Sequence, residues 1–195
     1  MNKNIILCGV GGQGTVLASR LISAAAMKEG LPVQSAETIG MAQRGGSVFS
    51  HIRIGEGVNT PMIGLGQADL ILGFELGETV RLLPYLKEDG MVIAADKAVM
   101  PVTASLAGGY DPDVMRSFLR EILQKRLMLV PADQALAQIG SPKVLNLLLL
   151  GCACISRSLG LSPASFDAAI RENVPEKFLN LNLSAFQYAN AMMIL

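Results

Sequence analysis

Short apolar runs alternate with longer amphipathic stretches along the first two thirds of the chain. The runs at residues 4–8, 31–36, 69–74, 91–95 and 127–130 predict buried strands, because they are brief and bounded by turn residues. Residues 48–54 alternate between apolar and polar side chains, which predicts a strand with one wetter face. Helical spacing predicts helices at residues 15–28, 78–86 and 112–125.

After residue 130 the pattern is helical, with segments expected around residues 132–139, 143–159, 163–172 and 175–192. Alternating strands and helices predict an α/β protein, a Rossmann-like three-layer fold with a mostly parallel sheet covered on both faces. We expect a single domain over residues 1–195. The C-terminal helical segment, residues 142–195, then packs either on the sheet or on a partner.

The composition is apolar for a globular chain of this length. Of the 195 residues, 51% are hydrophobic and 16% charged, the formal net charge is zero, and the mean hydropathy is +0.43. Such values predict a sheet covered on both faces or a large surface buried against partners. No run reaches the roughly 18 apolar residues of a membrane span. A neutral chain without basic clusters is a poor nucleic-acid binder, and the N-terminus does not resemble a signal peptide, so we expect a cytoplasmic protein.

The three cysteines favour packing over chemistry. Their odd number, with Cys8 in a predicted buried strand, indicates a reduced protein without a disulfide framework. Cys152 and Cys154 lie two positions apart in a predicted helix and so point to different faces. The C-x-x-C-x-x-C spacing of iron–sulfur proteins is absent, and we predict no metal site in this chain.

The first glycine-rich stretch, residues 9–14, follows a predicted strand and precedes a helix. Gly9, Gly11 and Gly14 fit the G-x-G-x-x-G pattern, which permits a tight turn, a close backbone approach and close helix packing. The free N–H groups of such a helix start favour an anion. Glu37 stands near the distance at which a dinucleotide site places a ribose ligand. Nucleotide binding and a purely structural turn both remain open on these residues.

A second stretch, residues 37–47, adds three glycines and a single cation. Arg44 carries a planar fork of donors suited to carboxylate or phosphate, and Gln13 and Gln43 can add amide contacts. Gly45 and Gly46 allow backbone geometries closed to other residues. We expect the two stretches to form a polar patch at the carboxyl ends of the strands, where open α/β sheets bind ligands. The alternative is that Arg44 forms a salt bridge or a subunit contact.

The two stretches, together with Asn146 and Gly151, resemble the gamma subunit or gamma domain of 2-oxoacid:ferredoxin oxidoreductases. This family includes the pyruvate, 2-oxoisovalerate, 2-oxoglutarate and indolepyruvate enzymes. The resemblance covers nearly the whole chain, and the combination of both motifs is its specific part. The candidate cofactor-binding or interface residues are Gly9, Gly11, Gly12, Gln13, Gly14, Glu37, Gln43, Arg44, Gly45 and Gly46.

The resemblance implies a complex that decarboxylates a 2-oxoacid on thiamine diphosphate, passes electrons through iron–sulfur clusters to ferredoxin and transfers the acyl group to coenzyme A. This chain lacks a G-D-G…N-N motif and a cysteine cluster. The resemblance therefore implies that thiamine diphosphate, magnesium and the clusters belong to alpha/beta-type and iron–sulfur partner subunits. It leaves coenzyme A as a possible ligand and implies a chain without catalytic residues, inactive when isolated. The motifs do not distinguish among the oxoacids.

Two alternatives come from other classes: a self-contained NAD-binding Rossmann dehydrogenase and a nucleotide-binding scaffold. A dehydrogenase is disfavoured because no lysine–histidine or tyrosine–lysine pair can be assigned. His51, the single histidine, is typical of a packed or surface residue in a strand. Carboxylates near helix starts are usually caps or dipole partners. The remaining polar candidates at strand ends are Asp69, Glu75, Glu78, Asp96 and Lys97.

Overall fold

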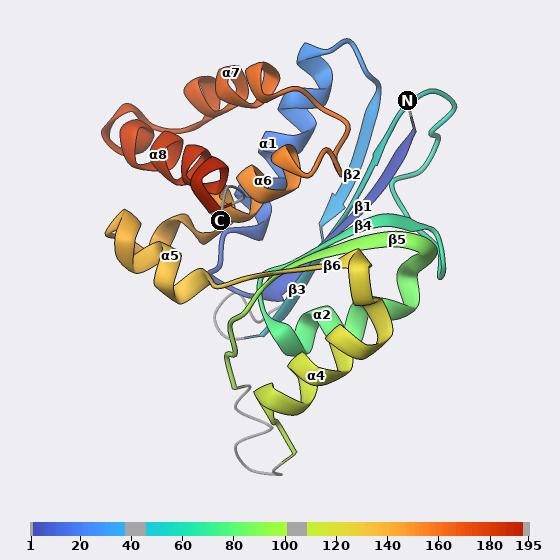
Figure 1. Cartoon of the computed structure of the whole chain (residues 1–195). Helices are drawn as coiled ribbons and strands as arrows, with labels where there is room; N and C mark the ends of the chain where they lie inside the picture. Colours follow the sequence, from blue (N-terminus) through green and yellow to red (C-terminus); the bar gives the residue numbers. More distant parts are fainter. Residues whose placement is uncertain (1, 38–45, 101–108, 193–195) are drawn as a thin grey trace.

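A computed structural model describes residues 2–37, 46–100 and 109–192. In that part of the chain, six strands alternate first with helices and then give way to helices alone (Figure 1). The strands are β1 (Lys3–Val10), β2 (Val33–Glu37), β3 (Ser47–Ile54), β4 (Ala68–Gly73), β5 (Leu86–Ala95) and β6 (Leu127–Val130). The α-helices are α1 (Thr15–Lys28), α2 (Leu76–Leu82), α4 (Pro112–Leu123), α5 (Ala132–Ile139), α6 (Leu145–Ile155), α7 (Pro163–Asn173) and α8 (Glu176–Met192), and the 3-10 turns are η1 (Leu83–Tyr85), η2 (Gln124–Arg126) and η3 (Pro142–Val144).

The strands form one sheet in the order β2-β3-β1-β4-β5-β6. The pairs β1–β4, β4–β5 and β5–β6 are parallel, whereas β3 is antiparallel to both β1 and β2. The predicted mostly parallel sheet is therefore confirmed, and its exception is the strand with the alternating pattern. The prediction that β3 has one wetter face is wrong at its centre, where Ser50, His51 and Ile52 are all buried.

Helices cover both faces of the sheet, which accounts for the high hydropathy (Figure 1). On one face, α1 and the helices after β6 enclose a core centred on α6, in which every residue from Leu145 to Cys154 is buried. On the other face, α2 and α4 enclose a second core with Ile71, Val92 and Leu119. The C-terminal helices thus share a core with one face of the sheet.

Element boundaries depart from the prediction where proline or the sheet intervenes. The helix expected over residues 78–86 ends at Leu82, because Pro84 lacks an N–H to continue it, and η1 leads straight into β5. Within the described residues no single helix is long and apolar enough to cross a membrane. The adjoining segments Ala132–Ile139 and Pro142–Ile155 satisfy that test only as a pair, with a bend of 119° between them.

Candidate functional site

Antiparallel pairing of β1 with β3 places the end of the second glycine stretch, Gly46 and Ser47, beside the first. Gly9 lies opposite Val48 and Val10 opposite Ser47, so the end of β1 meets the start of β3. The Gly11 N–H then donates to the Gly46 carbonyl over 2.8 Å. Of the second stretch, Gly46 and Ser47 therefore lie at the carboxyl end of β1. The Gly11 N–H, however, is occupied by this bond and is not available to a ligand.

Gln13 ties the turn to the neighbouring strand. Its Oε1 accepts from the Val10 N–H at 2.7 Å, and its Nε2 donates to the Phe74 carbonyl at 3.0 Å. A Cβ on Gly9 would lie 2.6 Å from Gln13 Oε1 and 2.7 Å from Phe74 Cβ. Gly9 is thus a residue of close approach within β1, and the Gln13 amide stabilises the turn with both of its ends. Both ends of this amide are thus engaged within the protein.

Gly12 and Gly14 adopt left-handed backbone geometries, with φ of +101° and +85°. Among the described residues, no heavy atom lies within 4 Å of a Cβ built on Gly12. Gly14 is crowded, because its Cβ would lie 2.7 Å from Asn146 Nδ2. Asn146 reaches Gly14 from α6, and its Nδ2 donates to the Gly14 carbonyl over 3.4 Å. The third glycine of the motif therefore makes room for α6 in the C-terminal segment.

The start of α1 has the chemistry of an anion site. Its N-cap is Gly14, which supplies no side-chain hydrogen bond to the first turn. Gly12, two residues before this helix start, is exposed. Uncapped N–H groups at the positive end of a 14-residue helix favour a phosphate or carboxylate. The turn therefore fits an anionic group, although fewer of its donors are free than the motif alone suggests.

A cation that the sequence reasoning missed lies beside this turn. The Arg81 guanidinium, from α2, contacts Ser47 Oγ at 2.5 Å and Glu78 Oε2 at 2.6 Å. Its Cζ lies 5.5 Å from the centre of the Phe49 ring. Ser47 pairs with Val10, so these contacts bring Arg81 to the rim of the glycine turn. The sequence of α2 does not predict this placement, because Arg81 contacts Ser47 of β3, a residue 34 positions earlier in the chain.

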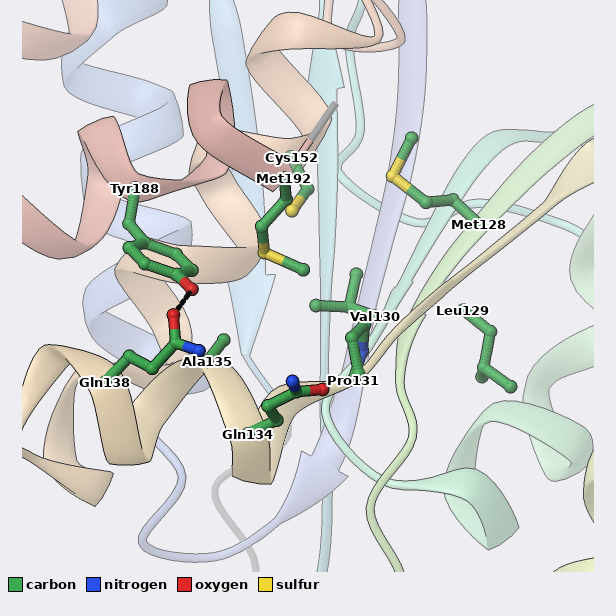
Figure 2. Close-up of a pocket in the computed structure, with 10 residues that line it drawn as sticks. All are labelled: Met128, Leu129, Val130, Pro131, Gln134, Ala135, Gln138, Cys152, Tyr188 and Met192. Carbon is green, nitrogen blue, oxygen red and sulfur yellow. Dashed lines mark hydrogen bonds between the residues drawn. The ribbon is translucent and has the colours of Figure 1, made fainter. Parts of the chain in front are cut away.

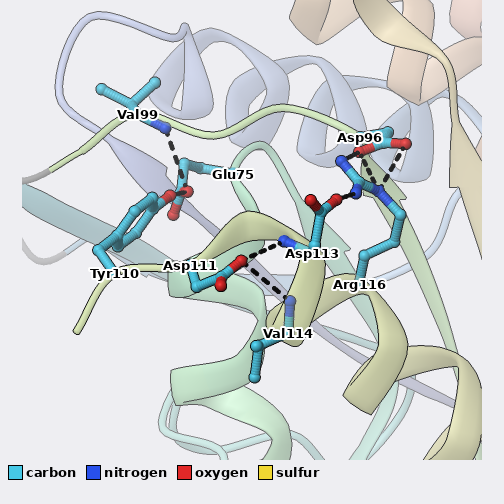
Figure 3. A network of polar contacts seen from close by, with 8 residues as sticks. All are labelled: Glu75, Asp96, Val99, Tyr110, Asp111, Asp113, Val114 and Arg116. Carbon is cyan, nitrogen blue, oxygen red and sulfur yellow. Dashed lines mark hydrogen bonds and ion pairs between the residues drawn. The ribbon is translucent and has the colours of Figure 1, made fainter.

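Glu75 is a buried carboxylate at the carboxyl end of β4, only 1% exposed (Figure 3). It caps α2 by accepting from the Glu78 N–H at 2.8 Å, and it also accepts from the Val99 N–H at 3.3 Å and from the Tyr110 hydroxyl. Burial, followed by the nearby Glu75 carboxylate, raises the pKa of Tyr110 well above its usual range. The expectation that helix-start carboxylates are caps is confirmed here. Glu75 also binds Val99 and Tyr110, which come directly before and after residues 100–109.

Glu37 does not lie next to the glycine turn. It ends β2, where it pairs with Ser50 of β3. Because β3 lies between β1 and β2, Glu37 is two strand spacings from β1, about 10 Å across the sheet. Ser50 in turn faces Leu7, so Glu37 is level with the middle of β1 and not with the turn. The residues Gln43, Arg44 and Gly45 lie outside the described part of the chain.

His51 is a packed strand histidine, one of the two expectations for it. It is 2% exposed, its Nδ1 accepts from the Ile63 N–H at 3.2 Å, and its ring meets Phe49 and Tyr85 edge to face. Burial lowers the pKa of His51. The neutral imidazole must therefore carry its proton on Nε2, which has no hydrogen-bond partner among the described residues.

The other titratable candidates are engaged in structural contacts. Lys87 pairs with Asp69 at 2.5 Å and Arg116 with Asp96 at 2.9 Å, the latter shown in Figure 3. Lys97 pairs with Asp133 at 2.6 Å. The three cysteines are free thiols and buried, and burial raises the pKa of each. Within the described ranges, no three histidine, cysteine or acidic side chains gather as a metal site would require.

A mostly parallel sheet covered by helices on both faces, with a glycine turn at the carboxyl end of β1, defines an α/β protein of the Rossmann-like class. The family model described as pyruvate ferredoxin/flavodoxin oxidoreductase matches residues 4–192, and the chain belongs to this family. The expectation drawn from the paired motifs is thereby confirmed at the level of the family.

Three relatives show where the chain lies within that family. Indolepyruvate oxidoreductase subunit IorB of Thermococcus kodakarensis is 34% identical, over 94% of this chain and 92% of the relative. IorB of Methanothermobacter thermautotrophicus is 37% identical, over 96% and 95%. The common gamma subunit of the pyruvate/ketoisovalerate oxidoreductases of Pyrococcus abyssi is 29% identical, over 93% and 91%.

Two solved structures share the fold. The gamma subunit of a keto/oxoacid ferredoxin oxidoreductase from Geobacter sulfurreducens aligns with a TM-score of 0.73 at 23% identity, covering 100% of this chain and 97% of that one. The 2-oxoglutarate:ferredoxin oxidoreductase of Magnetococcus marinus, solved with 2-oxoglutarate, coenzyme A and succinyl-CoA bound, aligns with a TM-score of 0.72 at 19% identity. The alignment covers 100% of this chain and 31% of the magnetococcal chain.

Proposed function

We propose that this chain is the gamma-type subunit of an indolepyruvate-class 2-oxoacid:ferredoxin oxidoreductase. One observation carries the proposal: the chain is 34% and 37% identical to two IorB subunits, and each alignment covers at least 92% of both sequences. The lower identity to the pyruvate/ketoisovalerate gamma subunit, 29%, favours indolepyruvate among the oxoacids. In this proposal the complex works in the cytoplasm and reduces ferredoxin.

The chemistry of the reaction belongs to partner subunits in this proposal. The Glu75 carboxylate, the His51 ring and the cysteine thiols are buried, which leaves them poorly placed to move protons or electrons for a substrate. Thiamine diphosphate, when bound in a partner with its magnesium, would supply the decarboxylation, and iron–sulfur clusters would carry the electrons. The contribution of this chain is to scaffold the complex and to offer the glycine turn.

The glycine turn is proposed to receive an anion, either the pyrophosphate of coenzyme A or a carboxylate of a partner subunit. The support is the uncapped start of α1 and the exposure of Gly12; the nearby Arg81 guanidinium is already paired with Glu78 and adds little free charge. The magnetococcal enzyme that shares this fold was solved with coenzyme A. Gly12, Gly14, Gln43, Arg44, Gly45 and Gly46 are proposed to face the anion. Gly9, Gly11 and Gln13 shape the turn through their own contacts, and Glu37 is set apart by one strand.

Activity of the assembled complex tests the function. The chain should be purified alone and with its co-purifying partners, and each preparation assayed for viologen reduction with indolepyruvate and coenzyme A. Pyruvate and 2-oxoglutarate serve as matched substrates. We expect no turnover by the isolated chain and a preference for indolepyruvate in the complex. Turnover by the chain alone, or purification without any thiamine-containing partner, would refute the proposal.

Substitution of Arg44 tests the role of the paired loops in that complex. Arg44→Ala should weaken coenzyme A use or assembly by about 1.5–3 kcal/mol if a charged hydrogen bond is lost. Arg44→Lys should recover only part of the loss, because a point charge does not reproduce the fork. If Arg44→Ala equals wild type in both acyl transfer and assembly, the proposed role of Arg44 is refuted. Residues 37–47 would then serve only as a structural turn.

A stand-alone NAD-dependent dehydrogenase is the alternative that the first motif alone would favour. The strand order counts against it, because β3 separates β1 from β2 and removes Glu37 from the place of a ribose ligand. Calorimetric titration of the isolated chain with NAD distinguishes the two. Binding together with turnover by the chain alone would support the dehydrogenase.

A further inference from the structure

A cavity lies beside β6, on the face of the sheet that α1 and α6 cover. It has a volume of about 340 Å³ and is enclosed by β6, α5, α6 and α8 (Figure 2). Its wall is mostly apolar and includes Met128, Val130, Ala135, Cys152 and Met192. The exposed Gln134 and Gln138 stand on α5 at the polar side of the cavity, and Tyr188 donates to Gln138 Oε1. This volume accommodates a large apolar side chain with room to spare.

The cavity adjoins an open edge of the sheet. In the described part of the chain β6 pairs only with β5, and it is the last strand in the order. The Val130 carbonyl accepts from the Asp96 N–H at 2.7 Å, so the backbone groups of Val130 point toward β5. Successive residues of a strand direct these groups to opposite edges, so those of Leu129 point outward. β6 itself carries no charge or proline, the features that usually protect an edge from pairing.

We propose that an extended segment of a partner subunit adds to the edge of β6 and inserts a large apolar or aromatic side chain into this cavity. The Leu129 N–H and carbonyl would pair with the backbone of that segment at the usual strand spacing of about 4.8 Å. A small molecule or a helix does not offer donors and acceptors in that arrangement. The inference rests on the proposed function, which supplies the partner subunit.

A second copy of this chain fits the edge less well. If two β6 strands paired across a twofold axis normal to the sheet, each would present Met128 and Val130 on the cavity face. Those two side chains already line their own cavity, so neither is free to fill the neighbour's. The Met-rich wall also suits an aromatic insert, because thioether sulfurs make favourable contacts with aromatic rings.

Residue-resolved hydrogen exchange tests the strand addition. The Leu129 amide should exchange readily in the isolated chain and at least about tenfold more slowly in the assembled complex, because assembly gives it an acceptor. The Val130 amide, which faces β5, is the internal control and should change little. A complex that forms and turns over without slowing exchange at Leu129 would overturn this inference and leave the proposed function intact. Failure of the chain to form any complex would instead overturn the proposed function.

Substitutions at the cavity mouth supply an independent test. Gln138→Trp places a bulky ring at the mouth from an exposed position, and Ala137→Trp on the same helix is its control outside the cavity lining. We expect the first to weaken assembly by about tenfold and the second to leave it near wild type. Equal effects of both would refute the proposal. Two results with the isolated chain would also refute it. Slow exchange at Leu129 that depends on concentration would indicate that a second copy pairs with β6. Slow exchange that is lost when residues 193–195 are deleted would indicate that these residues cover the edge.

Discussion

Alanine substitutions at Gly12 and Gly14 separate backbone strain from crowding at the glycine turn. Both residues have positive φ, so an alanine at either position costs about 1–2 kcal/mol of left-handed strain. Among the described residues, Gly14 has a close neighbour, Asn146 Nδ2 at 2.7 Å from the added Cβ, and Gly12 has none. Asn146 is 3% exposed within α6 and has little room to move, so overpacking adds about 1–3 kcal/mol at Gly14.

The free energy of unfolding of both variants can be measured by urea denaturation with the native chain as reference. We expect losses of about 1–2 kcal/mol for Gly12→Ala and about 2–5 kcal/mol for Gly14→Ala. At about 2–4 °C per kcal/mol for a chain of this size, the difference between them is also visible in thermal melts. Adding Asn146→Ala to each variant completes a double-mutant cycle.

The cycle shows whether α6 is the cause of the larger loss. Asn146→Ala should couple to Gly14→Ala by roughly 0.5–3 kcal/mol, because removing the amide relieves the contact. It should couple little to Gly12→Ala, because Asn146 is not among the atoms within 4 Å of a Cβ at Gly12. Equal losses for the two glycine variants, or strict additivity at Gly14, would refute the assignment of Gly14 to packing against Asn146.

Three further predictions concern buried groups. Burial lowers the pKa of His51, so the unfolded chain binds the proton more readily, and the stability from the neutral ring is fully present above about pH 6.5 and lost as the pH falls below it. The free energy of unfolding, measured by chemical denaturation between pH 5 and 7, should therefore fall with decreasing pH, and the same fall in His51→Gln would contradict the assignment. Gly151→Ala should destabilise the chain by about 1–3 kcal/mol, because the new Cβ meets the Phe186 carbonyl and Ala189 of α8; a melt equal to wild type would contradict that contact. Burial raises the pKa of Cys154 to about 11 and of Cys152 to about 12, so thiol reagents at pH 8 should label the cysteines only after unfolding; rapid labelling of the native chain would contradict their burial.

The sequence predicted the elements of this fold because their signals are local. Hydrophobic spacing placed α1 at Thr15–Lys28 and β6 at Leu127–Val130, where the structure has them, and it identified the run of helices after β6. The two glycine stretches were also readable as a pair, since each depends on a few adjacent residues. Their combination was specific enough to indicate the family to which the chain belongs.

Strand order and side-chain partners were decided only by the tertiary structure, because they depend on residues far apart in the chain. The insertion of β3 between β1 and β2 moved Glu37 away from the turn. Packing of α6 against α1 placed Asn146 beside Gly14, 132 positions earlier in the chain. The position of α2 next to β3 placed Arg81 beside Ser47. A periodic pattern fixes which face of an element is apolar, whereas the identity of what covers that face depends on how distant elements pack together.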